Sequence, residues 1–138
     1  MTTYASHTRL NAYRAVAAHG GVAAADPHRL VLMLLDGALE RVAAAKGALQ
    51  NGAQVQKSAL VHRVVEILDE LRGSLDMKAG GDIARNLADL YDYCSRQLFK
   101  ASLEGRADLL DEVAGLLREI RSAWVAIPGQ SASRHAGA

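Results

Sequence analysis

The stretch that decides the fold is ADPHRLVLMLLDGAL, residues 25–39, which contains six consecutive apolar residues from Leu30 to Leu35. Such a run can belong to a buried strand, to part of a membrane span or to the core of a helix. Asp26 and Pro27 favour a helix, because Asp accepts hydrogen bonds from free first-turn N–H groups and Pro at the first helical position has no N–H to satisfy. Apolar residues then continue at helical spacing to an Asn-Gly pair. The stretch therefore predicts a helix over residues 27–50 that is buried on more than one side.

Three further segments repeat the three-and-four spacing of apolar residues and predict helices over residues 55–75, 83–103 and 107–127. The Gly80-Gly81 pair, with the Asp that follows it as a possible cap of the next helix, separates the second helix from the third. Gly105 separates the third helix from the last. Because the connections are short, each helix returns beside the one before it. The sequence therefore predicts an all-α fold, an antiparallel up-and-down four-helix bundle with a short N-terminal docking helix.

The apolar stripes of the last two helices define a predicted core. They contain Ile83, Leu87, Leu90 or Tyr91, Cys94 and Leu98 in one helix, and Leu110, Val113, Leu117, Ile120 and Trp124 in the other.

The bundle is expected to occupy residues 23–127, with a flank on either side. Residues 1–22 carry Leu10 and Tyr13 on one face of a short amphipathic stretch that ends in a glycine pair. A helix of this length is marginal alone, so we expect it to dock on the bundle weakly, as a displaceable cap. Residues 128–138 are small, polar and glycine-rich, and are expected to be disordered.

Composition excludes several classes of protein. The 138 residues are half apolar, which is enough for a core in a single domain. Lys and Arg number 16 against 15 Asp and Glu, with no basic block, so we expect no nucleic-acid partner. A single cysteine, an amino terminus without an apolar run, and no stretch approaching the ~20 residues of a membrane span predict a cytoplasmic protein without membrane insertion.

The search for catalytic chemistry gives no candidate site. Di-iron bundles use Glu-x-x-His pairs, and this chain contains none, so no metal is expected. Cys94 lies on an apolar stripe and is interpreted as a core thiol. The Gly80-Gly81 pair follows no strand and no P-loop Lys accompanies it, so it is interpreted as a turn. We expect no cofactor and no enzymatic activity.

One surface strip suggests binding of a partner. A strip of Asn86, Asp89, Tyr93, Gln97 and Lys100 recurs at three-and-four spacing on another side of the helix from the apolar stripe. An aromatic ring among polar groups suits contact with an incoming chain. A solvated face on which Tyr93 covers a neighbouring side chain would give the same pattern, and composition does not separate the two.

Several motifs occur together in one order. They are Tyr13 followed by Val-Ala, then ADPHRLVLMLLDGALERVAAA, ILDELRGSLD, GGDIARNLADLYDYCSRQL and LDEVAGLLREIRSAW. In this order, from Tyr13 to Trp124, they resemble the FliS family of cytoplasmic export chaperones for flagellin. One departure is Leu35, because the family usually has Tyr before the Asp-Gly pair. If that ring contacts the client in relatives, the contact in this chain is weaker or differently shaped.

The resemblance implies a function. Such a helical bundle binds the disordered carboxy-terminal segment of flagellin, prevents premature polymerisation and delivers flagellin to the flagellar type III export gate, as a monomer or weak dimer. The expected site is a groove between the helices at 27–50 and 83–103, with the amino-terminal stretch covering part of it. The residues expected to bind the partner are Leu10, Tyr13, Leu30, Leu34, Asp36, Ala38, Asn86, Asp89, Tyr93 and Gln97. A helical adaptor for another amphipathic client shares every physical feature and differs only in the motif match.

Overall fold

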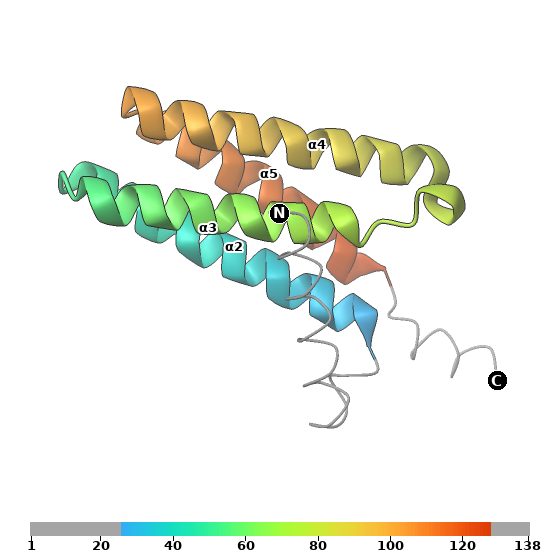
Figure 1. The fold of residues 1–138 in the computed structure, drawn as a ribbon. Coiled ribbons are helices and arrows are strands. Elements are labelled where there is room, and N and C mark those ends of the chain that lie inside the picture. The colour runs from blue at the N-terminus through green and yellow to red at the C-terminus, as the bar shows by residue number, and fades with distance from the viewer. Residues whose placement is uncertain (1–25, 128–138) are drawn as a thin grey trace.

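The computed structural model describes residues 26–127, which form four helices. They are α2 (Pro27–Gln50), α3 (Gln54–Gly73), α4 (Met77–Glu104) and α5 (Ala107–Ala126), shown in Figure 1. Each helix packs mainly against two neighbours: α2 and α4 both contact α3 and α5. The predicted four-helix bundle is confirmed. The predicted docking helix at 1–22 and tail at 128–138 lie outside the described residues.

Helix α2 begins and ends where the sequence predicts. The Asp26 carboxylate accepts hydrogen bonds from the backbone N–H groups of His28 at 3.0 Å and Arg29 at 3.3 Å. These bonds satisfy donors that have no partner inside the helix. At the other end, Gly52 takes the left-handed conformation with φ of 73°, which favours glycine. The apolar run is buried at Leu34 and Leu35, as a helix in a bundle requires.

Helix α4 begins earlier than predicted. Its N-cap is Asp76, whose carboxylate accepts bonds from the backbone N–H groups of the two residues after Met77 at 3.1 and 3.0 Å. Gly81, with φ of 53° and ψ of −128°, then interrupts the helix. The glycine pair therefore marks a kink one turn inside the helix instead of its start, because Asp76 caps that first turn. Gly105 ends α4 in the left-handed conformation, as expected.

The core lies along the axis of the bundle. Its members are leucines, valines, alanines, Ile67, Ile120, Tyr91 and Cys94, contributed by all four helices. Burial raises the pKa of the Cys94 thiol to about 11, with a smaller contribution from the charge of Glu112, so the thiol stays protonated at neutral pH. Ile83 was predicted in the core but is 73% exposed, because the kink at Gly81 precedes it and only the following residues of α4 point inward.

Polar contacts tie neighbouring helices together. The buried Lys57 donates from Nζ to the backbone carbonyl oxygen of Ser102 at 2.8 Å, which joins the first turn of α3 to the last turn of α4. Lys46 pairs with Asp111 across α2 and α5 at 2.8 Å. No helix between residues 26 and 127 is long and apolar enough to cross a membrane.

Candidate functional site: an apolar pocket at one end of the bundle

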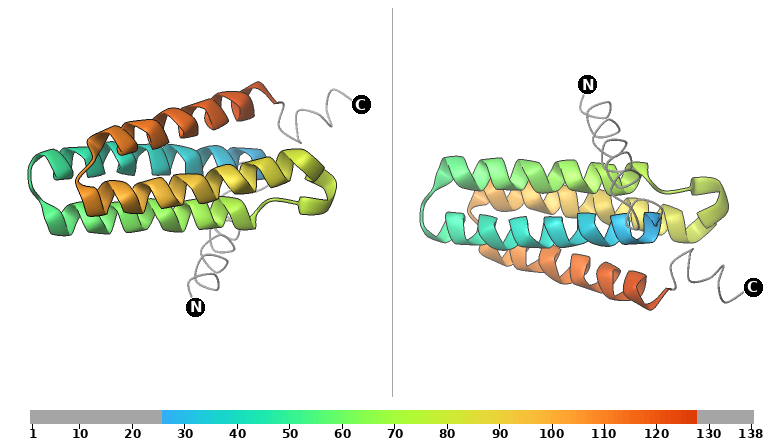
Figure 2. Two further views of the ribbon diagram at one scale, coloured as in Figure 1. Left: turned by 90° about the horizontal axis from the view of Figure 1, so that it is seen from above. Right: turned by 90° about the horizontal axis from the view of Figure 1, so that it is seen from below.

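A pocket opens at the end of the bundle where α2 and α4 begin and α3 and α5 end. Figure 2 shows these termini together, beside the connection between α3 and α4. The cavity measures about 410 Å³, within the ~300–1,000 Å³ of sites that take small ligands or side chains. Its walls are mostly apolar, and it is lined by Pro27, His28, Leu30, Val31, Leu34, Leu71, Ser74, Leu75, Asp76, Gly80, Ile83, Ala84, Leu87, Tyr91, Trp124 and Ile127.

The inner wall of the pocket is built from residues that also belong to the core. Leu30 and Leu34 come from α2, Leu71 from α3 and Tyr91 from α4, and all four are buried. Burial raises the pKa of Tyr91 to about 12, with a smaller contribution from Cys94, so the phenol is neutral at physiological pH. The inner wall is therefore uncharged, preformed and suited to apolar side chains.

One side of the rim is formed by a contact between His28 and Trp124 that we call the clasp. The two rings stack with centroids 5.4 Å apart and an angle of 13° between their planes. His28 Nε2 donates to the Trp124 carbonyl oxygen at 2.6 Å, and Trp124 Nε1 donates to the His28 carbonyl oxygen at 3.1 Å. The clasp joins the first turn of α2 to the last turn of α5. Trp124 was predicted in the core, and the structure instead leaves it half-buried at the pocket, because α5 ends there.

Another part of the rim is the first turn of α4. A Cβ added at Gly80 would lie 2.6 Å from the Cβ of Ala84, so only glycine fits this approach without a shift. The exposed side chain of Ile83 follows the kink and borders the pocket. The glycine pair, read from the sequence as a turn, thus shapes the mouth of the pocket.

The predicted site residues of α2 lie in different parts of the structure. Leu30 and Leu34 line the pocket, as their assignment to the site requires. Asp36 lies elsewhere and accepts at Oδ1 from Arg121 Nε of α5 at 2.5 Å. Ala38 is fully buried in the core and offers no surface to a partner. The two helices of the predicted groove, α2 and α4, are diagonal in the bundle, and residues of both line the pocket at its end. Binding of a partner between them stays a prediction.

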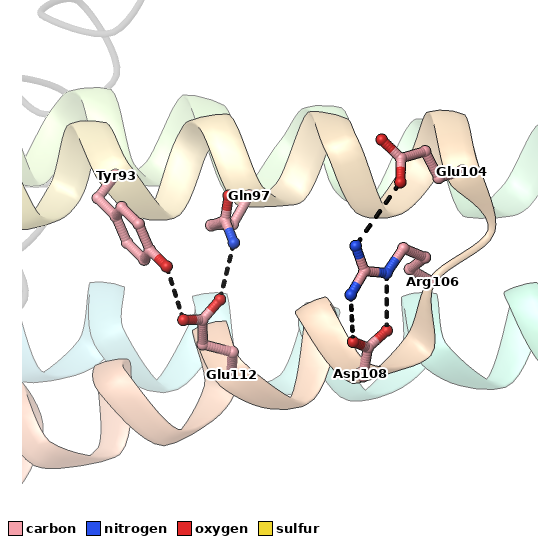
Figure 3. Close-up of polar contacts among 6 residues, drawn as sticks. All are labelled: Tyr93, Gln97, Glu104, Arg106, Asp108 and Glu112. Carbon is pink, nitrogen blue, oxygen red and sulfur yellow. Dashed lines mark hydrogen bonds and ion pairs between the residues drawn. The ribbon is translucent and has the colours of Figure 1, made fainter.

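The predicted strip on α4 lies outside the pocket. Asn86 and Asp89 are exposed. Figure 3 shows Tyr93 and Gln97 pointing toward Glu112 of α5. Tyr93 Oη donates to Glu112 Oε2 at 2.6 Å, and Gln97 Nε2 donates to Glu112 Oε1 at 2.8 Å. The bond from Tyr93, followed by that from Gln97, lowers the pKa of Glu112 below its ordinary value of 4.5. Two of the five strip residues therefore tie α4 to α5, and the role of the strip toward a partner stays a prediction.

Beside this contact, Figure 3 shows a second polar group at the turn between α4 and α5. Arg106 pairs with Asp108 at 2.7 Å and with Glu104 at 3.7 Å. These exposed pairs hold the connection and lie at the end of the bundle away from the pocket.

Sequence reasoning missed part of the pocket. Leu75 and Ile127 were not assigned to the site, and Leu87 and Tyr91 were assigned to the core alone. The available signal was positional: apolar residues close to the starts of two helices and the ends of the other two must meet at one end of an antiparallel bundle. Among the described residues, no group of three or more His, Cys, Asp or Glu side chains is placed to hold a metal ion.

Comparison with known proteins matches the chain to one family. The sequence model described as flagellar protein FliS matches residues 9–131. The flagellar secretion chaperone FliS of Vibrio cholerae is 40% identical over 119 residues, which cover 86% of this chain and 88% of the relative. The protein of the same name from Salmonella typhimurium is 40% identical over 83% of this chain and 86% of its own length. Flagellar secretion chaperone FliSB of Pseudomonas aeruginosa is 39% identical over 81% of this chain and 89% of its own.

Proposed function

The chain belongs to the FliS family of flagellar secretion chaperones, and we propose that its client is the disordered carboxy-terminal segment of flagellin. In this proposal the chaperone holds the segment in the cytoplasm, prevents its premature polymerisation and delivers flagellin to the export apparatus. The client orders on the bundle as it binds, so it exchanges conformational entropy for buried apolar area.

The observation that carries the proposal is the preformed apolar pocket at the end of the bundle. An amphipathic segment presents apolar side chains at helical spacing, and such side chains fit a groove lined by leucines and aromatic rings. The lining also contains the polar residues His28, Ser74 and Asp76, and in this proposal they border the client backbone where it leaves the apolar wall. A folded partner would need a broad flat surface, whereas a pocket of this size suits inserted side chains.

We further propose that residues 1–22 cover the pocket until the client arrives, with Leu10 and Tyr13 in place of client side chains. The described chain begins at Asp26, and the next two residues line the pocket, so the preceding segment is attached at its mouth. A site that is partly masked shows a reduced apparent affinity. Deletion of residues 1–22 should therefore leave client binding by calorimetry unchanged or tighter. Loss of binding in a truncated protein that stays helical would make this segment part of the site.

Calorimetry of the flagellin carboxy-terminal peptide against Ile83→Asp tests the client site. Ile83 is exposed at the rim, so the change should leave the fold intact while placing a carboxylate where apolar side chains enter. We expect affinity to fall about tenfold or more, roughly 1.4 kcal/mol per decade. The matched control is Leu103→Asp, an exposed apolar residue on the same helix, far from the pocket.

Two results would contradict the assignment. Unchanged affinity in Ile83→Asp would exclude the pocket as the client site. A wild-type protein that ignores the flagellin peptide but forms a stoichiometric complex with another amphipathic segment would favour the adaptor alternative over the flagellin chaperone.

A further inference from the structure

The inner wall of the pocket, otherwise made of leucines, contains one hydroxyl group. It belongs to Tyr91 of α4, a residue that is only 3% exposed. Among the described residues, Tyr91 Oη has no hydrogen-bond partner. The oxygen is nevertheless not sealed from solvent. Because Tyr91 lines the cavity, we infer that its hydroxyl opens into the pocket.

The other polar side chains that line the pocket differ from Tyr91, because each already forms a hydrogen bond within the protein. The rings of His28 and Trp124 donate to each other's backbone carbonyl oxygens. Ser74 Oγ donates to a carbonyl oxygen of α3 at 2.8 Å, and the Asp76 carboxylate caps α4. All four residues are half-buried or exposed. Among the described residues that line the pocket, Tyr91 alone combines burial with a polar group that has no partner.

The Tyr91 hydroxyl is a neutral donor and acceptor at physiological pH. Burial, with a smaller contribution from Cys94, raises the pKa of Tyr91 to about 12, so the phenol keeps its proton. A protonated phenol can donate one hydrogen bond and accept another. The residues that share the inner wall are leucines, which carry no charge. A carboxylate or an ammonium group brought to this depth would therefore lose its hydration without gaining an ionic partner.

Displacement of solvent from the pocket makes this hydroxyl selective. Solvent that enters the pocket can satisfy the hydroxyl of the free protein. A purely apolar side chain that displaces this solvent leaves a buried hydroxyl without a partner, which opposes binding. A side chain with an apolar body and a neutral amide or hydroxyl at its end fills the same space and restores the hydrogen bond. Sites that hydrogen-bond a group of the ligand strongly reject analogues that lack this group.

We propose that Tyr91 Oη forms a hydrogen bond with a neutral polar side chain of the client, an amide or a hydroxyl, which enters the pocket among apolar neighbours. This inference rests on the proposed function, since it names the kind of side chain that the client site selects. The leucines of the inner wall supply the apolar contact, and Tyr91 determines which side chain is accepted at the inner end of the pocket.

The variant Tyr91→Phe tests the proposal, because it removes the hydroxyl and keeps the ring. Calorimetry of the full chain with the flagellin carboxy-terminal peptide should show an affinity lower by roughly five- to tenfold, the effect of one hydrogen bond in a buried site. Urea denaturation should show unchanged or higher stability, because the hydroxyl has no partner within the described chain. Lower stability with unchanged affinity would mean that the hydroxyl has only a structural role, and would overturn the proposal.

A scan of the flagellin peptide identifies the side chain that meets Tyr91. Each Asn, Gln, Ser and Thr of the peptide is replaced in turn by an apolar residue of similar size. One replacement should weaken binding to the wild-type protein by roughly five- to tenfold and leave binding to Tyr91→Phe nearly unchanged, as a double-mutant cycle shows for two groups in contact. Equal losses in the two proteins at every position would overturn the inference and leave the flagellin assignment intact.

Small probes decide the inference if the wild-type protein does not bind the flagellin peptide, a result that would refute the proposed client. Hexanamide, hexanoate and hexylammonium share one alkyl chain and differ in the charge of the polar end. In an NMR titration of the full chain with isotope-labelled tyrosine Cζ, hexanamide should bind most tightly and shift the resonance that is missing from Tyr91→Phe. The variant should bind hexanamide several-fold more weakly. Equal binding of the three probes, or of hexanamide by the two proteins, would then overturn the inference.

Discussion

Replacing Trp124 with alanine should destabilise the protein by about 2–3 kcal/mol, which is less than the ~3–5 kcal/mol of a fully buried Trp. The change removes the ring stacked on His28, a contact of about 0.5–1.5 kcal/mol, and the hydrogen bond from the indole N–H, about 1 kcal/mol. The remainder is burial of a ring that is only half covered. Because a domain has ~5–15 kcal/mol of stability, the variant should still fold.

The measurement is urea denaturation followed by circular dichroism, since the variant lacks the only Trp. Trp124→Phe keeps a ring without the N–H donor and should lose about 1–2 kcal/mol. A double-mutant cycle with His28→Ala isolates the stacking of the two rings, because both hydrogen bonds of the clasp are accepted by backbone carbonyl oxygens that remain in the variants, and it should give a coupling energy of about 0.5–1.5 kcal/mol. Coupling near zero would show that the stacked rings do not stabilise the fold. A loss of unfolding free energy above about 4 kcal/mol in Trp124→Ala would show that Trp124 is a core residue.

The remaining predictions concern the core, the rim and the strip. Leu35→Tyr adds a ring to a fully buried site and should destabilise the protein by about 1–3 kcal/mol without changing the client affinity of folded protein, as denaturation and calorimetry will show. Gly80→Ala should weaken client binding by shifting the rim, whereas Gly115→Ala, with open space around its Cβ, should raise the melting temperature and leave binding alone. Tyr93→Phe should return the pKa of Glu112 toward 4.5, because it removes the hydrogen bond that lowers this pKa most. A carboxylate with a lowered pKa contributes stability that is present above its ordinary pKa and is lost as the pH falls. The acid limb of a plot of stability against pH should therefore become shallower in the variant. Tyr93→Ala should weaken client binding with little change in melting temperature, if the strip contacts the client as predicted.

The bundle could be predicted from the sequence because its determinants are local. Asp26 with Pro27 at one helix start and Gly105 at a helix end act through their own backbone neighbours, and the structure contains both caps. The start of α4 was misplaced because two Asp residues flank the glycine pair, and spacing alone does not say which one caps. Asp76 does so, which leaves Gly81 to absorb the kink.

The pocket could be predicted only in part, because it depends on how four helix ends meet. Leu30 and Leu34 were assigned to the site, but their partners Leu75 and Ile127 lie just beyond the ends of α3 and α5, and the positions of those ends relative to α2 follow only from the three-dimensional structure. The spacing of apolar residues identifies the face of a helix that points inward. It does not distinguish residues in the packed core from residues that line a pocket. Trp124 shows the limit: it continues the apolar stripe of α5, yet it reaches the rim because the bundle ends beside it.

The structure changes the interpretation of Leu35, the position at which the chain departs from the family pattern. Leu35 is fully buried and does not line the pocket, whereas its neighbour Leu34 does. A larger ring at this position would press on the core before it reached a client, so the departure concerns packing of α2. In the proposed binding mode, the client contact then depends on the buried leucines around Leu35 that line the pocket. Because that wall exists without a client, the entropy of ordering falls mainly on the client segment, which is what coupled folding and binding on a rigid chaperone requires.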